Sequence, residues 1–240
     1  MQWNCNIAVI LHCVQKDVKP AGLRAARVRE NEERIVRAAH ELFARDGYQA
    51  TALTAVADAA GVAHRTVYVR FGTKAALLKR VIDVALVGDL APVDVVSRGW
   101  YRTAMTAPTL EERIAALAKG SARLMATAAD VIAVAREAEP TEPLLAAAAH
   151  AGRAATRDAT RAFWARARDD GLLPPGCDLA WLGDTTSVLA HAETYLLMRE
   201  TLGTTPDEYE KWLAATWGRM ASTGTAPPAS SATAAARPPG

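Results

Sequence analysis

Apolar residues recur every three or four positions along most of the chain, which is the spacing of helices that bury one face. The first clear stretch covers residues 31–46 and stops at Gly47, a residue type that commonly ends helices. Runs rich in Val, Ile and Tyr with alternating polar positions would indicate strands, and the sequence contains none. The pattern therefore predicts an all-α protein.

Residues 51–74 predict two short helices joined at a glycine turn. Thr51 is expected to cap the first helix, because a threonine hydroxyl accepts a hydrogen bond from a free amide of the first turn. The apolar face of this helix consists of Leu53, Val56, Ala57 and Ala60. Gly61 then stands where the turn of a helix-turn-helix motif needs a residue that tolerates positive φ.

The second helix of this pair, residues 64–71, has too few apolar side chains to serve only as core. Val67 and Phe71 lie four residues apart and are expected to pack inward. Most of the other side chains are polar or basic: His64, Arg65, Thr66, Tyr68 and Arg70. A two-turn helix of this composition is typical of a recognition helix, whose outer residues meet bases and phosphates in a major groove.

Longer helices are expected in the rest of the chain. They cover residues 74–90 with Thr73 as cap, a short stretch near 100–105, residues 110–127 begun by a Thr109–Glu112 capping box, residues 130–138 and residues 144–170. The last two helices cover residues 178–201, capped by Asp178, and 206–220, begun by Thr205 and Glu208. The helix at 178–201 is apolar on two sides, so it must be covered on two sides.

Two such helices near the end of the chain predict self-association through a four-helix bundle formed by two copies. The alternative is that they only close the core of one protomer. Residues 221–240 are rich in Pro, Ser, Thr and Ala and are expected to be disordered. Residues 1–23 do not match the helices that follow, and we interpret them as a disordered or non-native leader.

The net charge of +2 is unevenly distributed along the chain. Residues 24–80 hold eleven Lys and Arg against six Asp and Glu, which favours a polyanion as the partner of the N-terminal part. The three cysteines form no CxxC pair, and no apolar run approaches the roughly 20 residues of a membrane span. We therefore expect a cytoplasmic protein without membrane contact, disulfide, metal or cofactor.

An all-helical enzyme is the main alternative from another functional class. It would need a catalytic constellation, and the sequence contains no HExxH motif, nucleophile elbow or phosphate-binding loop. The five histidines lack the spacing of metal ligands. No catalytic or metal-binding residues are therefore assigned.

Residues 31–78 contain the segments RIVRAAHELFARDGYQATALTAVADAAGV and RTVYVRFGTKAALL. They resemble the DNA-binding domain of the tetracycline-repressor (TetR) family of transcriptional regulators. The resemblance implies a DNA-binding domain at residues 24–78, followed by a helical ligand-binding and dimerisation domain at residues 79–220. It implies a homodimeric repressor of a palindromic operator on double-stranded DNA, released by a small molecule. A constitutive or activating regulator without an effector remains the alternative.

The resemblance places the family's DNA contacts on seven residues by position: Thr54, His64, Arg65, Thr66, Tyr68, Arg70 and Lys74. Arg65 suits a bidentate contact to guanine or phosphate, and Lys74 suits a phosphate near a helix N-terminus. Ala63 departs from the family, because a Ser or Thr often caps the recognition helix there, and the helix is expected to be less ordered without DNA. Arg70 stands where the family often has His, so its charge is independent of pH.

A regulator of this kind needs an effector pocket within residues 91–220. Candidate lining residues are aromatic, sulfur-containing or polar: Trp100, Tyr101, Met105, Met125, Trp164, Trp181, His191 and Tyr195. Each of them also fits ordinary helical core. A pocket of this composition suits an apolar or aromatic small molecule, with His191 and Glu193 as the polar groups that orient it.

Overall fold

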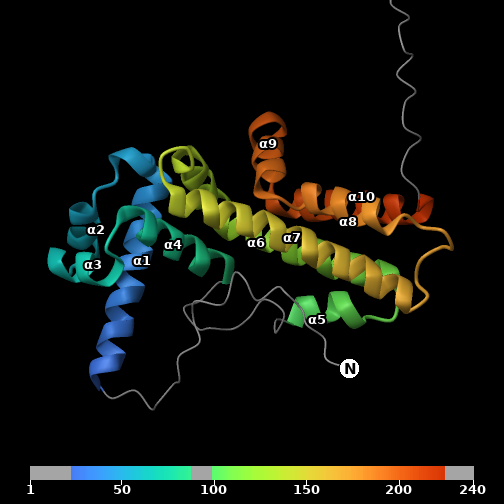
Figure 1. The fold of residues 1–240 in the computed structure, drawn as a ribbon, viewed down its shortest axis with the longest axis horizontal. Coiled ribbons are helices and arrows are strands. Elements are labelled where there is room, and N and C mark those ends of the chain that lie inside the picture. The colour runs from blue at the N-terminus through green and yellow to red at the C-terminus, as the bar shows by residue number, and fades with distance from the viewer. Residues whose placement is uncertain (1–22, 88–98, 225–240) are drawn as a thin grey trace, which may run out of the picture.

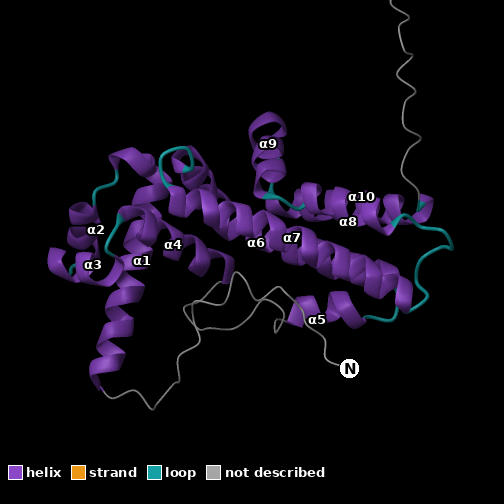
Figure 2. Cartoon of the chain, viewed as in Figure 1, coloured by secondary structure: helices purple, strands orange, loops and turns teal. Residues whose placement is uncertain are grey.

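The computed structural model describes residues 23–87 and 99–224, which form ten helices and no strand (Figures 1 and 2). The helices are α1 (Leu23–Ala50), α2 (Leu53–Ala60), α3 (His64–Phe71), α4 (Lys74–Val87), α5 (Gly99–Thr106), α6 (Leu110–Ala138), α7 (Pro143–Asp169), α8 (Leu179–Leu189), α9 (Ala192–Leu202) and α10 (Pro206–Thr223). The expected all-α class is confirmed. The predicted leader up to residue 22 and the predicted tail from residue 225 lie outside the described residues.

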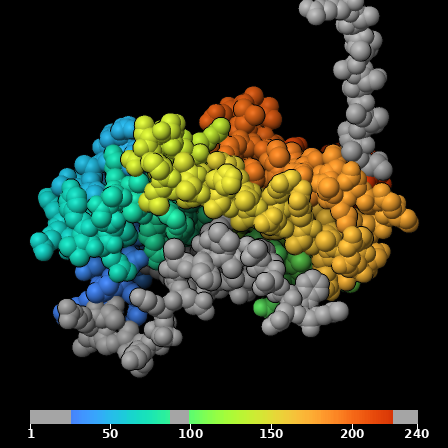
Figure 3. Space-filling view, viewed as in Figure 1, coloured from blue at the N-terminus to red at the C-terminus, as the bar shows by residue number. Residues whose placement is uncertain are grey.

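The helices α6 and α7 run along the long axis of the molecule and connect its two ends (Figure 1). At one end, α1 to α4 pack together, and α1 and α4 both contact α6. Toward the other end, α8 packs on α7, while α5 and α10 pack on α6. The space-filling view shows the same division, with α2 and α3 forming the outer surface of the first end (Figure 3).

The end made by α1 to α4 has its own hydrophobic core. Phe43, Val56, Val67 and Leu77 are fully buried there, one from each of the four helices. The core does not stop at α4, because Val131 of α6 belongs to it as well. The small N-terminal bundle therefore rests directly on the ends of α6 and α7 that face it.

A second core fills the larger part of the molecule. Its largest fully buried side chains are aromatic: Phe163 and Trp164 of α7 with Tyr209 and Trp217 of α10. Trp164 donates its indole Nε1–H to Thr186 Oγ1 of α8 at 2.9 Å, so its one polar atom is paired. Close packing also involves α5, where the ring of Trp100 covers Gly120 so tightly that a Cβ there would lie 2.2 Å from it.

Two predictions of where a helix continues or breaks are wrong. Residues 110–138 form one helix, because Ala128 and Ala129 continue it as buried residues instead of ending it. The predicted helix at 178–201 is two helices, α8 and α9, separated where His191 adopts extended backbone. The hydroxyl of Thr194 donates to the carbonyl of Val188 at 2.7 Å and stabilises this break, for which the sequence has no Gly or Pro.

Other boundaries also differ from the sequence pattern. The first helix begins at Leu23, eight residues before its predicted start. Its predicted stop at Gly47 is confirmed as a break, because Gly47 has non-helical backbone and a short helical segment to Ala50 follows it within α1. Gly47 has φ 76°, which is the left-handed region that glycine adopts readily. The final helix extends to Thr223, into the predicted tail. The predicted capping boxes of Thr109 with Glu112 and of Thr205 with Glu208 are both confirmed.

None of the helices in the described ranges combines the length and the apolar character that crossing a bilayer requires.

Candidate nucleic-acid interface

The α2–α3 unit has the geometry of a helix-turn-helix motif. Leu53, Val56, Ala57 and Ala60 are buried, as the spacing predicts. Gly61 ends α2 with φ 62°, and its amide donates to the carbonyl of Asp58 at 3.0 Å. The chain then reverses into α3 within three residues.

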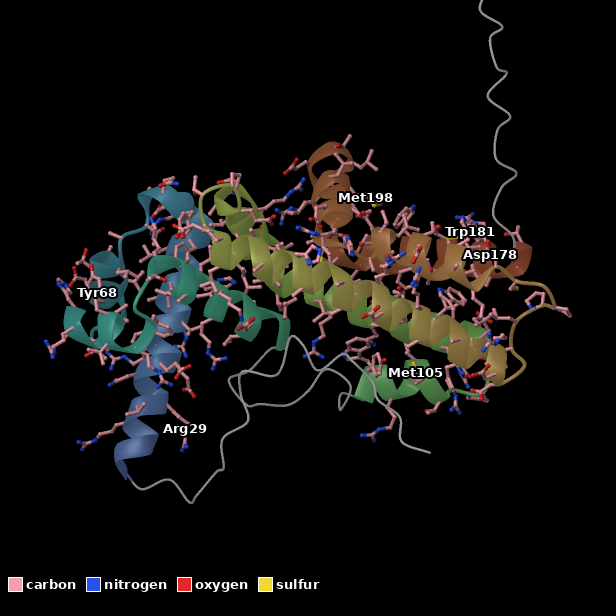
Figure 4. All side chains as sticks on the ribbon, in the orientation of Figure 1. Arg29, Tyr68, Met105, Asp178, Trp181 and Met198 are labelled. Atoms are coloured by element: carbon pink, nitrogen blue, oxygen red, sulfur yellow. The ribbon has the colours of Figure 1, made fainter. Side chains whose placement is uncertain are left out.

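Helix α3 packs inward through a narrow strip and exposes the rest of its surface. Val67 is fully buried, and Phe71 packs beside it as a partly buried residue. On the opposite side Arg65, Tyr68 and Val69 are exposed, Tyr68 to 49% and Val69 to 74%. Figure 4 shows Tyr68 at the outer end of the molecule, away from α6 and α7. This face is therefore free to meet another molecule.

Val69 is a residue that the sequence interpretation missed. An apolar side chain exposed to this degree on a recognition helix suits contact with a thymine methyl group in a major groove. Its position was available from the spacing, because a residue midway between the buried Val67 and Phe71 must face outward on a helix.

Neither helix of the motif has a side-chain cap at its N-terminus. Ala63 precedes α3 without such a bond, as predicted. The prediction for Thr51 is wrong, because Ala52 occupies the capping position of α2. The buried Thr51 hydroxyl instead donates to the carbonyl of Gly47 at 2.8 Å, so it stabilises the end of α1.

Two charged residues of α1, Arg34 and Glu32, hold the helices of the motif in position. The Arg34 guanidinium donates to the carbonyls of Ala60 at 2.5 Å and Gly61 at 2.8 Å, which lie at the C-terminal end of α2. The buried carboxylate of Glu32 accepts hydrogen bonds from Arg70 of α3 and, at 2.9 Å, from Arg80 of α4. These contacts tie α2, α3 and α4 to one helix.

The Glu32 carboxylate is ionised in the folded protein. Burial acts to raise its pKa, but the hydrogen bonds and charges of Arg70 and Arg80 outweigh burial and lower the pKa below its ordinary value. Arg70 is therefore a member of a charge cluster inside the protein as well as a residue of the recognition helix.

The remaining predicted DNA contacts divide into exposed and engaged side chains. Thr54 and Arg65 are exposed, and Thr66 is partly exposed. His64 Nε2 lies 2.7 Å from a carboxylate oxygen of Asp58. Lys74 is engaged within the protein, since its Nζ donates to the carbonyl of Tyr48 at 2.7 Å and lies 4.3 Å from the centre of the Tyr48 ring.

The predicted effector residues belong to the second core or its edge. Met125, Trp164 and Tyr195 are buried, while the others are partly buried: Trp100, Tyr101, Met105, Trp181 and His191. Two surface hollows, one between α1 and α2 and one between α6 and α9, are lined by none of these eight residues. The larger one, about 550 Å³, lies between α6 and α9.

Three buried polar atoms in the larger part of the molecule have no hydrogen-bond partner among the described residues: Arg113 Nη1, His191 Nε2 and Trp217 Nε1. Burial lowers the pKa of His191, and the nearby Arg153 charge lowers it further while Glu193 opposes the shift. His191 is therefore neutral at pH 7. No group of three or more His, Cys, Asp or Glu within residues 23–87 and 99–224 is arranged to hold a metal ion.

The motif and its supporting helices match a known family. Residues 35–81 fit the sequence pattern of the bacterial regulatory proteins of the tetR family. These residues form a tetR-family helix-turn-helix domain. The match covers the helix-turn-helix motif and the helices packed on it, and it supports DNA binding by this part of the chain. No curated protein is similar enough in sequence to count as a relative.

Solved structures share the fold over most of the chain. A regulator from Mesorhizobium loti MAFF303099 assigned to the tetR family is 19% identical, with a TM-score of 0.61 over 83% of this chain and 99% of its own. NalD, the secondary repressor of the MexAB-OprM multidrug efflux pump in Pseudomonas aeruginosa, is 20% identical, with a TM-score of 0.58 over 80% and 97%. SmeT in complex with triclosan is 16% identical, with a TM-score of 0.60 over 78% and 89%. At these identities the likeness concerns the fold alone, over the larger helical part of the chain as well as the N-terminal domain.

Proposed function

We propose that this tetR-family protein is a homodimeric repressor that binds a palindromic operator and is released by an apolar or aromatic small molecule. The exposed face of α3 supports the DNA-binding part of the proposal most directly. Arg65, Tyr68 and Val69 offer a bidentate donor, a phosphate anchor and an apolar contact on one short helix. Thr54, His64 and Thr66 flank them and complete the proposed contact surface.

A binding titration tests this surface. Arg65→Ala is expected to weaken binding to a duplex from the protein's own promoter region about tenfold or more, because a bidentate base contact contributes about 1–3 kcal/mol. Fluorescence anisotropy on labelled duplex measures the affinity. Arg102→Ala is the matched control, since Arg102 is an exposed arginine on α5, far from α3. Equal affinity of both variants would contradict the proposal.

Dimerisation through α8 and α10 is supported by their outward side chains. Val188 of α8 is 57% exposed, and Trp181 is partly exposed on the same helix. Trp212 and Met220 of α10 are also only partly buried. An isologous pairing of these faces would place two α3 helices on one duplex, with half-sites about 34–36 Å apart for one helical turn.

Light scattering coupled to size exclusion tests the dimer. Val188→Glu is expected to give a monomer with weakened operator binding, because the new charge would be buried without a partner. Leu144→Glu is the control, since Leu144 is a 43%-exposed apolar residue on α7, outside the proposed interface. A wild-type protein that is monomeric at the concentration of DNA binding would contradict this part of the proposal.

The effector part of the proposal is supported by the unpaired polar atoms of the larger core. Trp217 Nε1 is a buried hydrogen-bond donor in the apolar second core, so an apolar ligand with an acceptor oxygen would satisfy an atom that the protein leaves unpaired. Arg113 Nη1 is a second unpaired donor, on a guanidinium that already binds Asp170 and the carbonyl of Ala107. Triclosan is a suitable probe, because a protein of the same fold is known in complex with it. We expect it to raise the melting temperature and to lower operator affinity. Binding to the operator that responds to neither triclosan nor other apolar compounds would favour a regulator without an effector.

A further inference from the structure

The charge cluster of Glu32, Arg70 and Arg80 joins three helices of the DNA-binding domain. Glu32 lies on α1, and its side chain is only 9% exposed. Arg70 of the recognition helix binds one carboxylate oxygen, and Arg80 of α4 binds the other at 2.9 Å. Both oxygens of the carboxylate are thus occupied by arginines from the two helices that follow the turn.

The cluster changes what α3 presents to a polyanion. Arg70 is 48% exposed, but its guanidinium is turned toward α1 and its charge is compensated there. Arg65, by contrast, has no partner among the described residues and is exposed. Of the two arginines on α3, only Arg65 is therefore available to a phosphate or a base without breaking an existing ion pair.

Releasing Arg70 toward DNA would be unfavourable. It would leave a nearly buried carboxylate with one partner fewer, and a buried charge that loses a partner is strongly destabilising. It would also free α3 from α1, although α3 has no side-chain cap of its own to hold its first turn. The arrangement that keeps Arg70 on Glu32 is thus also the arrangement that fixes the direction of α3.

We propose that Arg70 is a positioning residue that holds the recognition helix through Glu32, and that it makes no phosphate contact on the operator. Glu32 acts as the internal counter-ion that prevents Arg70 from binding DNA of any sequence. This replaces the DNA-contact role that the family resemblance implied for Arg70. It rests on the proposed operator binding, and it adds a residue of α1 to those that determine sequence specificity.

The salt dependence of binding measures the number of phosphates that are contacted. Each phosphate neutralised on duplex DNA adds about 0.9 to the slope of log affinity against log salt concentration. Glu32→Gln releases one Arg70 in each protomer of the proposed dimer, so the slope is expected to steepen by about 1.8. Between 50 and 200 mM salt this is an additional loss of affinity of about tenfold. Affinity for a scrambled duplex at low salt should rise, and discrimination between promoter and scrambled duplex should fall.

Glu33→Gln is the matched control. Glu33 is the next residue on α1 and is exposed, so its loss removes the same charge without releasing an arginine. Its slope should equal that of the wild type. Arg70→Gln should also keep the wild-type slope while weakening promoter binding, and Arg70→Lys, which keeps the charge, should recover part of that loss. A similar slope for Glu32→Gln and Glu33→Gln would overturn the proposal.

The Arg70→Gln variant tests the positioning role independently if the Glu32→Gln variant does not fold. A slope that becomes shallower by about 1.8, which is 0.9 for each protomer, would show that Arg70 contacts a phosphate, and the positioning role would be wrong. An unchanged slope supports it. Failure of the operator-binding function would look different from failure of the role proposed for Arg70. In the first case the wild-type protein itself would bind promoter and scrambled duplex equally well.

Discussion

At the scale of single residues, the polar side chains of this domain act mostly within the protein. Thr51 lies next to the start of α2 but stabilises the end of α1. Arg34 and Glu32 lie on α1, yet Arg34 binds the end of α2 and Glu32 binds Arg70 of α3. Lys74 binds carbonyls that follow the bend in α1. Arg65, Tyr68 and Val69 have no such partner, and they lie on the outer face of α3.

The Glu32 carboxylate predicts a specific acid sensitivity. Its pKa is lowered in the folded state, so its contribution to stability is fully present above its ordinary value of 4.5 and is lost as the pH falls through the lowered pKa. Urea unfolding should show the wild type more stable than Glu32→Gln at pH 7, with the difference shrinking below about pH 4.5. A constant difference between pH 7 and pH 3 would disprove the assignment.

At the scale of elements, the starts of α6 and α10 followed local chemistry, whereas the continuity of the helices did not. The Thr–x–x–Glu boxes at Thr109 and Thr205 bind their own first turns, because all the atoms involved lie within four residues. The break between α8 and α9 has no such local signal. It allows Tyr195 and Leu196 to be buried in the second core, which a straight continuation of α8 would not ensure.

The capping box of α10 is expected to contribute to the stability of the folded protein. Thr205→Ala removes the hydroxyl that accepts the Glu208 amide at 3.3 Å and should lower the free energy of unfolding by about 1 kcal/mol. The helix carries Tyr209 and Trp217 in the second core, so the loss should appear in the global thermal transition. Thr205→Ser retains the hydroxyl and should stay near the wild type. An alanine variant as stable as the serine variant would show that the cap contributes nothing.

At the scale of the molecule, the two cores are joined by packing and by polar contacts. Tyr48 donates its hydroxyl to Glu142 Oε1 at 2.7 Å, across the junction of the DNA-binding domain with α7. The hydroxyl of Thr127 on α6 donates to the carbonyl of Ala85 on α4 at 2.8 Å. Helices α6 and α7 are thus connected to α1 and α4 by side-chain hydrogen bonds as well as by the shared core.

The Tyr48–Glu142 contact can be tested by removing one oxygen atom. Burial, together with the neighbouring Glu142 carboxylate, raises the pKa of Tyr48, so its hydroxyl remains a donor throughout the neutral range. Tyr48→Phe should lower the free energy of unfolding by about 1–2 kcal/mol, since a hydrogen bond to a charged acceptor is lost while the ring stays. Tyr68→Phe removes an exposed hydroxyl and should leave stability unchanged. Equal stability of both variants in urea would exclude a contribution from the contact.

The sequence by itself determined the helical class, the helix-turn-helix motif and the inward and outward faces of its helices. The reason is that these features depend on spacing within one or two turns, as Leu53, Val56 and Gly61 illustrate. The capping boxes and the missing cap at Ala63 were predictable for the same reason.

Only the tertiary structure decided which polar groups are free for other molecules. Arg65 and Arg70 look equivalent in the sequence, yet Arg70 is paired because α1 places Glu32, 38 residues away, beside it. The α8–α9 break likewise depends on distant segments, because it brings Tyr195 and Leu196 into the second core. A side chain's local pattern tells which way it points, whereas its partner is determined by how the helices pack.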